Sequence, residues 1–164
     1  TVSGAAKAVS HLAPRFLTVH ASGGTAMIRA AVEASPKTHV TGVTILTSLS
    51  EDDVTDIGFK NKALESAVGL AKIAVCAGAG AIVCSPLEIV AIRSAVGSGP
   101  IIITPGVRPA DSQGNDDQVR TMTPKAAIAA GANLVVIGRP ITQSWSLGSE
   151  AMRDRAALIA SELI

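Results

Sequence analysis

Short aliphatic runs alternate along the chain with longer segments in which apolar residues recur every three or four positions. The runs are rich in Val, Ile and Leu and predict strands at residues 16–20, 40–46, 81–84, 101–103 and 133–137. The longer segments predict helices at residues 2–12, 25–34, 62–77, 87–96 and 149–163, with shorter helices after Ser50 and Thr123. One helix followed by five strand–helix units predicts a parallel sheet with right-handed crossovers.

This order of elements favours an α/β fold of the TIM (β/α)8 barrel type. A complete barrel of that type typically needs about 250 residues, whereas this chain has 164. No low-complexity segment or second domain interrupts the pattern. We therefore expect residues 1–164 to form a single domain, a partial barrel of about five βα units preceded by a helix.

Two of the predicted strands end in a glycine turn that carries an arginine. The run at 101–103 leads to Gly106 and Arg108, and the run at 133–137 leads to Gly138 and Arg139. Gly106 follows a proline and allows the chain to turn with a positive φ. The last two strand-to-helix loops of a TIM barrel commonly form a phosphate site. We predict that Arg139 binds phosphate through its planar fork; a salt bridge to a neighbouring helix is the alternative.

The other predicted strand ends carry hydroxyl groups and a histidine. Thr47 and Ser48 could contact a polar ring or cap the following helix, and His20 fits a structural role better than that of a base. Gln118, at the end of a polar loop, could close over a ligand, although an exposed glutamine usually has no such role. No Lys, Asp or Glu stands at a predicted strand end. The strand ends therefore predict a binding site without an acid–base group.

Composition removes several classes of function. A net charge of +1 without a basic run, and two Phe and one Trp without Tyr, argue against nucleic acid as a partner. The longest uncharged run is shorter than a membrane span, and no signal-peptide pattern opens the chain, so we expect a cytoplasmic protein. Cys76 and Cys84 lie in apolar stretches and predict buried, reduced thiols. The aspartates at 111, 116 and 117 resemble a solvated loop, and we expect no metal site.

Six motifs, taken in order, carry a resemblance to a known family. They are Val19-His20-Ala21-Ser22-Gly23-Gly24, Val43-Thr44-Ile45-Leu46-Thr47-Ser48, Val83-Cys84-Ser85, Thr104-Pro105-Gly106-Val107-Arg108-Pro109, Asp117-Gln118 and Val136-Ile137-Gly138-Arg139-Pro140-Ile141-Thr142. Together they resemble bacterial orotidine 5′-phosphate decarboxylase over nearly the whole chain. A lone Gly-Arg-Pro would be a weak signal, whereas six ordered motifs are specific.

The resemblance implies a cofactor-free lyase that converts orotidine 5′-phosphate to UMP in pyrimidine biosynthesis, on a TIM barrel that forms a homodimer. This chain would supply strands four to eight. By motif, Gly138, Arg139 and Gln118 would hold the phosphate, Thr47 and Ser48 would meet the pyrimidine amide, and Arg108 would line the site. We predict that the backbone N–H groups around Gly106 belong to the same phosphate site, and Thr1 would belong to a site shared with the partner subunit.

The family's catalytic charges have no counterpart in this chain. In the family, a lysine between two aspartates stands on the third strand, in a segment that ends Asp-Ile-Pro-Asn-Thr-Val. Thr1-Val2 match the last two residues of that segment. The resemblance thus implies no catalytic residue here and an N-terminal complementary polypeptide that carries the lysine and aspartates. The alternatives are a non-catalytic phosphate-binding barrel fragment and a related phosphate-sugar decarboxylase or aldolase.

Overall fold

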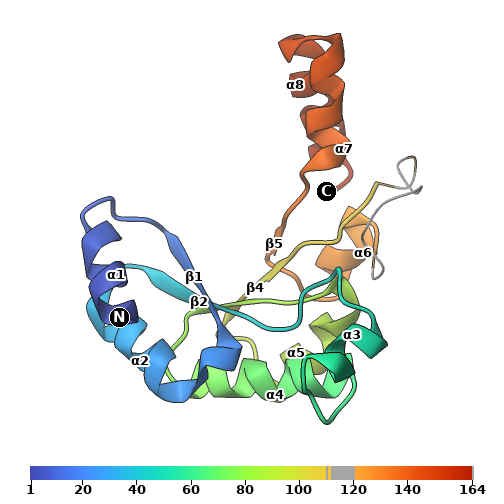
Figure 1. Cartoon of the computed structure of the whole chain (residues 1–164). Coiled ribbons are helices and arrows are strands. Elements are labelled where there is room, and N and C mark those ends of the chain that lie inside the picture. Colours follow the sequence, from blue (N-terminus) through green and yellow to red (C-terminus); the bar gives the residue numbers. More distant parts are fainter. Residues whose placement is uncertain (110, 112–120, 164) are drawn as a thin grey trace.

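The computed structural model describes residues 1–109, 111 and 121–163. Within these residues, five parallel strands form one sheet in the order β1-β2-β3-β4-β5 (Figure 1). Their bounds are β1 Phe16–His20, β2 His39–Val43, β3 Ala81–Val83, β4 Ile101–Thr104 and β5 Leu134–Val135. The sequence-predicted α/β class and parallel sheet are confirmed.

The helices confirm the predicted alternation and add short elements that were not predicted. The predicted helices are α1 Val2–Ser10, α2 Gly24–Ala34, α3 Glu51–Asp56, α4 Ala63–Cys76, α5 Ile89–Val96, α6 Pro124–Ala129 and α8 Ser149–Ser161, with the short helix η2 Pro86–Glu88 leading into α5. The short helix η1 Ala21–Gly23 stands where a turn was predicted. The additions are α7 Arg139–Thr142 and η4 Gln143–Leu147, which connect β5 to α8.

The start of α3 shows how a local pattern sets a helix boundary. The Ser50 hydroxyl accepts a hydrogen bond from the backbone N–H of Asp53 at 3.2 Å. The Asp53 carboxylate in turn accepts from the Ser50 N–H at 2.8 Å. This reciprocal capping box satisfies two backbone donors that a helix N-terminus otherwise leaves without partners.

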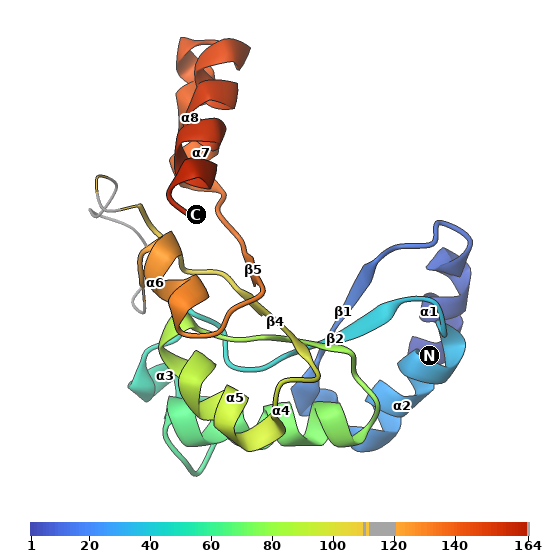
Figure 2. The ribbon, with the colours of Figure 1, turned by 180° about the vertical axis from the view of Figure 1, so that it is seen from behind.

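The two faces of the sheet differ in burial. Figures 1 and 2 show α2, α4 and α5 along one face, and the residues that point to it, such as Val40, Ile82 and Ile102, are at most 1% exposed. Successive side chains alternate between faces, so their strand neighbours point to the other face. There Thr41 and Ala81 in the middle of the sheet are fully buried, whereas Thr18 and His20 are exposed and Leu134 is 37% exposed. In the described chain, one face is therefore a packed core and the other is only partly covered.

Gly42 allows α4 to approach the sheet closely. A Cβ atom at Gly42 would lie 2.6 Å from the Cβ of Ala74 on α4, a separation that real side chains do not adopt. Ala67, Ala71 and Ala74 are fully buried along the same helix. Small residues on both sides thus let backbone pack against backbone in the core.

Arg93 joins α5 to the amino-terminal ends of β4 and β5. Its guanidinium donates hydrogen bonds to the carbonyl oxygens of Gly97 (3.1 Å), Pro100 (2.9 Å) and Gly131 (2.9 Å). It also donates to the Asn133 amide oxygen at 2.8 Å, which accepts from the Ile102 N–H at 2.8 Å. One side chain therefore holds the loops that precede the last two strands, which carry the candidate site at their other ends.

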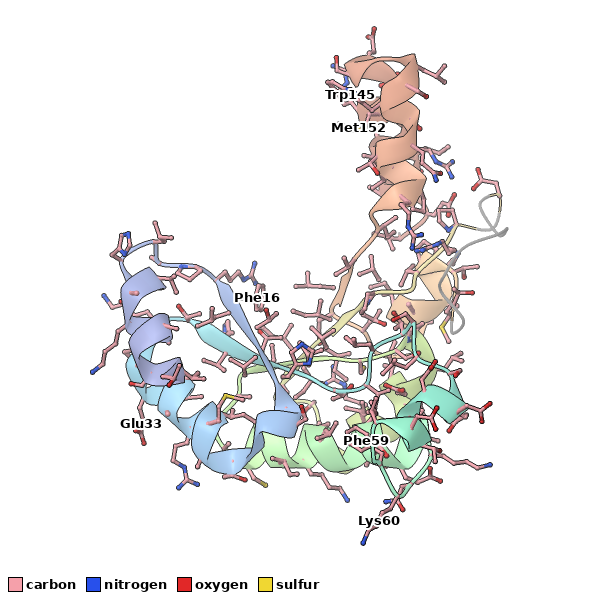
Figure 3. All side chains as sticks on the ribbon, in the orientation of Figure 1. Phe16, Glu33, Phe59, Lys60, Trp145 and Met152 are labelled. Carbon is pink, nitrogen blue, oxygen red and sulfur yellow. The ribbon has the colours of Figure 1, made fainter. Side chains whose placement is uncertain are left out.

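The final strand and helix depart from the sequence prediction. We predicted a buried strand at 133–137, but β5 has two residues, and Val136 beyond it is 50% exposed. β5 is an edge strand, and Figures 1 and 2 show α7 and α8 extending away from the sheet instead of covering it. Trp145 and Met152 lie toward the far end of this arm in Figure 3, and only Ile159 of α8 is buried. The burial prediction was wrong because, although α6 contacts β5, nothing in the described chain covers the face of the strand that carries Leu134 and Val136.

The structure also tests the predicted environment of the two cysteines. Both cysteines are free, as expected, but Cys76 is exposed. It stands two residues beyond the buried Ala74, on the opposite side of α4, so its predicted burial was wrong. Among the described residues, no helix has the length and hydropathy to cross a membrane, and no cluster of His, Cys, Asp or Glu could hold a metal.

Candidate functional site

The loops that follow β4 and β5 face a common hollow of about 160 Å³. Its lining consists of Pro105, Gly106, Arg108, Val136, Gly138 and Arg139. The two strands pair in parallel, and the Val136 N–H donates to the Thr104 carbonyl at 2.9 Å, so the pairing continues to the edge of the hollow. Four of the predicted site residues, two glycines and two arginines, are thereby brought together.

The first loop is shaped by a glycine and by a backbone bridge. Gly106 has a φ of +71°. This positive value, which the sequence predicted, is one that residues with a side chain rarely adopt. The Arg108 N–H then donates to the Met122 carbonyl at 2.9 Å, and the Met122 N–H donates to the Gly106 carbonyl at 3.3 Å. The Arg108 N–H is therefore already used, so the backbone donors around Gly106 cannot all serve a ligand. The Arg108 side chain is 7% exposed and donates to the Val107 carbonyl at 3.0 Å.

The second loop places Arg139 at the start of a short helix. Gly138 precedes α7, and its carbonyl accepts from the N–H groups of Ile141 (2.9 Å) and Thr142 (3.0 Å). Pro140 follows Arg139 and is buried, whereas Arg139 is exposed. The backbone on both sides of Arg139 is thus held, and Arg139 belongs to the lining of the hollow. Two arginines in the lining of one small hollow favour the binding of an anion. The hollow is too small to enclose a nucleotide-sized ligand, because sites for such ligands are typically about 300–1,000 Å³.

The remaining predicted residues lie outside the lining of this hollow. Thr47 and Ser48 form the turn after β2; Thr47 is 7% exposed, and Ser48 is exposed. Because Ser50 caps α3, the alternative role of Thr47 and Ser48 as caps does not hold. His20 is exposed at the end of β1. All of these residues share the carboxyl edge of the sheet with the hollow, as expected for parallel strands.

Thr1 and Gln118 are not brought to the hollow by the described chain. Thr1 is exposed at the start of α1, and Figures 1 and 2 both show that end beside α2, on the side of β1 opposite to β5. Gln118 lies outside the described residues, as do Asp116 and Asp117. The predicted roles of Thr1 and Gln118 stay predictions.

Two carboxylates near the site have partners that the sequence reading missed. Glu88 is 1% exposed and accepts the Ser85 N–H at 3.0 Å, completing a capping box at the end of β3. The Ser-x-x-Glu spacing could have revealed it. Asp111, predicted to be a solvated loop residue, instead pairs with Arg155 of α8 through two oxygens at 2.7 and 2.8 Å. No local signal connects residues 44 positions apart.

Comparisons with known proteins identify the family of the chain. The sequence model described as "Orotidine 5'-phosphate decarboxylase / HUMPS family" matches residues 1–153. The orotidine 5′-phosphate decarboxylases of Thermobifida fusca (strain YX) and Frankia casuarinae are 52% and 48% identical over 99% and 98% of this chain. This chain spans 67% of the first relative and 58%, less than two thirds, of the second.

Solved structures give the same result for the fold. The crystal structure of orotidine 5′-phosphate decarboxylase from Lactobacillus acidophilus superposes with a TM-score of 0.80 at 33% identity. The superposition covers 99% of this chain and 69% of the Lactobacillus acidophilus chain. From the family match over residues 1–153 and the identity to these relatives, the chain belongs to the orotidine 5′-phosphate decarboxylase / HUMPS family.

Proposed function

We propose that this chain carries the phosphate- and pyrimidine-binding part of an orotidine 5′-phosphate decarboxylase, which forms UMP in pyrimidine biosynthesis. The observation that carries the proposal is the hollow between the loops after β4 and β5, with Arg108 and Arg139 in its lining. A guanidinium binds a phosphate through two parallel hydrogen bonds, and two of them balance its charge. The identity of the nucleotide is inferred from the names of the relatives, which are orotidine 5′-phosphate decarboxylases.

The five strands are, in this proposal, strands four to eight of a (β/α)8 barrel. Both edges of the sheet, β1 and β5, pair on one side only within the described chain. The partly exposed face with Thr18, His20 and Leu134 would then be the barrel interior. An apolar hollow of about 300 Å³ between α1 and β1, lined by Val2, Val9 and Leu17 among others, offers a surface for the preceding unit. A complementary N-terminal polypeptide with three strands would close the barrel and cover both edges.

The chemistry of the reaction supports binding groups on this chain and catalytic groups on the complementary polypeptide. Decarboxylation leaves a developing carbanion that needs a nearby cation and then a proton. All six lysines are exposed and lie on helices or loops away from the strand ends. Arginine is a poor proton donor because its pKa exceeds about 12. The described strand ends thus offer binding groups, and we assign the lysine and aspartates of the reaction to the complementary polypeptide.

Thr47, Ser48 and Gln118 complete the proposed binding site. Thr47 and Ser48 stand at the same edge of the sheet as the hollow and would meet the pyrimidine amide. Gln118 would approach the phosphate from the loop that follows Arg108. Thr1 lies toward the opposite edge of the sheet, so a part for it in the site requires barrel closure or a second copy, in keeping with a homodimer.

A phosphate-sugar decarboxylase or aldolase on the same barrel would share the phosphate hollow but not the pyrimidine contacts. The experiment is therefore a comparison of UMP, uridine and ribose 5-phosphate by calorimetry. We expect UMP to bind most tightly. The Arg139→Ala chain should lose roughly 1.5–3 kcal/mol of UMP binding, about one to two decades of affinity, because a charge-assisted contact is removed. Unchanged UMP binding in this variant would refute the phosphate assignment.

A further inference from the structure

A single side chain of α8 connects the two loops that form the hollow. The Arg155 guanidinium donates to both carboxylate oxygens of Asp111, at 2.7 and 2.8 Å. Its Nε–H also donates to the Pro140 carbonyl at 3.2 Å. Asp111 stands three residues beyond Arg108, and Pro140 directly follows Arg139. Arg155 therefore bridges the two chain segments that hold the arginines of the site.

We propose that Arg155 is a positioning residue that holds the loops bearing Arg108 and Arg139 at the spacing needed to bind a phosphate. This inference rests on the proposed function, since it assumes that the hollow binds the phosphate of the nucleotide. It assigns the role to α8, a helix whose residues do not line the hollow. The substrate group concerned is the phosphate and not the pyrimidine ring.

The geometry favours a specific clamp over a general surface attraction. The Arg155 side chain is 16% exposed, whereas Asp111 is 61% exposed. A two-pronged contact needs the planar fork of arginine, and a third donor of the same group is used by Pro140. The hydrogen bond with Asp111 raises the pKa of Arg155, which favours the charged form of its guanidinium. Ile159 is the one buried residue of α8, so these hydrogen bonds add to a small buried contact in holding the helix beside the loops.

The same helix offers a matched control. Arg153 pairs with Glu150 at 3.2 Å, but both side chains are more than 70% exposed. Arg153→Met thus removes one positive charge from α8 without changing a contact to either loop. Arg155→Met removes one positive charge and also the hydrogen bonds to Asp111 and Pro140. We would measure affinity for UMP and for uridine, which lacks the phosphate, together with the melting temperature of each variant.

Arg155→Met should weaken UMP binding by about 5–10-fold, leave uridine binding unchanged, and exceed any effect of Arg153→Met. Asp111→Asn separates positioning from charge, because loss of a nearby carboxylate would by itself strengthen the binding of an anion. If Arg155 positions the loops, Asp111→Asn weakens UMP binding, and the double variant is no worse than the weaker-binding single variant. Arg155→Lys should recover little, since an ammonium lacks the fork.

Two results would overturn the inference while leaving the phosphate site intact. One is stronger UMP binding in Asp111→Asn than in the parent, and the other is equal UMP binding in Arg155→Met and Arg153→Met. A parent chain that binds UMP no more tightly than uridine would refute the phosphate site itself, and the inference with it. Asp111 is mostly exposed, so its substitution tests the clamp even if Arg155→Met fails to fold.

Discussion

Replacing Arg93 by methionine should destabilise the chain through the loops that precede β4 and β5. The substitution keeps an apolar stem of similar length but removes hydrogen bonds to four oxygens, three of them backbone carbonyls. Gly97 and Asn133 are exposed, so water can replace the lost donor there. Pro100 is buried and Gly131 is half-buried, so their carbonyls are left poorly satisfied.

A buried acceptor without a partner costs about 1–3 kcal/mol. Two such carbonyls, one of them only half-buried, give an expected loss of about 2–4 kcal/mol in the free energy of unfolding. For a chain of this size, each kcal/mol corresponds to roughly 2–4 °C, so the melting temperature should fall by about 5–15 °C. The full cost of four separate bonds is not expected, because the bonds share one side chain and do not add independently.

The assay is equilibrium unfolding in urea, followed by far-ultraviolet circular dichroism, with Arg153→Met as the control of equal charge change. Arg153 sits in an exposed pair, so its variant should stay within about 0.5 kcal/mol of the parent. Arg93→Lys should fall between the two, since one ammonium cannot reach all four oxygens. An Arg93→Met chain as stable as Arg153→Met would show that water satisfies these carbonyls and would refute the reasoning.

The remaining predictions concern packing, acid sensitivity and catalysis. Gly42→Ala should cost about 1–3 kcal/mol because its Cβ would meet Ala74, whereas Gly69→Ala, in an open position on α4, should stabilise by up to about 1 kcal/mol; equal urea midpoints would contradict this. Hydrogen bonds from Ser50 hold the pKa of Asp53 below its ordinary value of 3.8, so its contribution is complete above that value and is lost as the pH falls through the lower folded-state pKa. The difference in melting temperature between the parent and Asp53→Asn should therefore shrink between about pH 7 and about pH 3. Finally, the proposal predicts that the chain alone does not reduce the ultraviolet absorbance of orotidine 5′-phosphate, and that adding an N-terminal polypeptide with the proposed lysine and aspartates gives turnover. Activity of the chain alone would point first to His20 as the proton donor.

Sequence reading succeeded where the deciding interactions are local. The Ser50 and Asp53 pair lies three residues apart and meets within one helical turn, so its spacing was sufficient evidence for the start of α3. Gly106 follows a strand and a proline, and its positive φ followed from that context. The meeting of Gly106, Arg108, Gly138 and Arg139 also followed from sequence, because parallel strands place their carboxyl ends at one edge. The placement of Thr47 and Ser48 at that edge followed in the same way.

What only the tertiary structure decided depends on contacts between distant segments. The aliphatic run after Asn133 looks like a buried strand, yet Leu134 and Val136 are exposed because burial requires a neighbouring element that the described chain does not place there. Cys76 was assigned to the core by its apolar neighbours, whereas the rotation of α4 against the sheet turned it outward. Asp111 and Arg155 are far apart in sequence, and only the path of α7 and α8 brings them together. Local spacing determines helix caps, turns and strand polarity, but the docking of one element on another determines which side chains are buried and which charges meet.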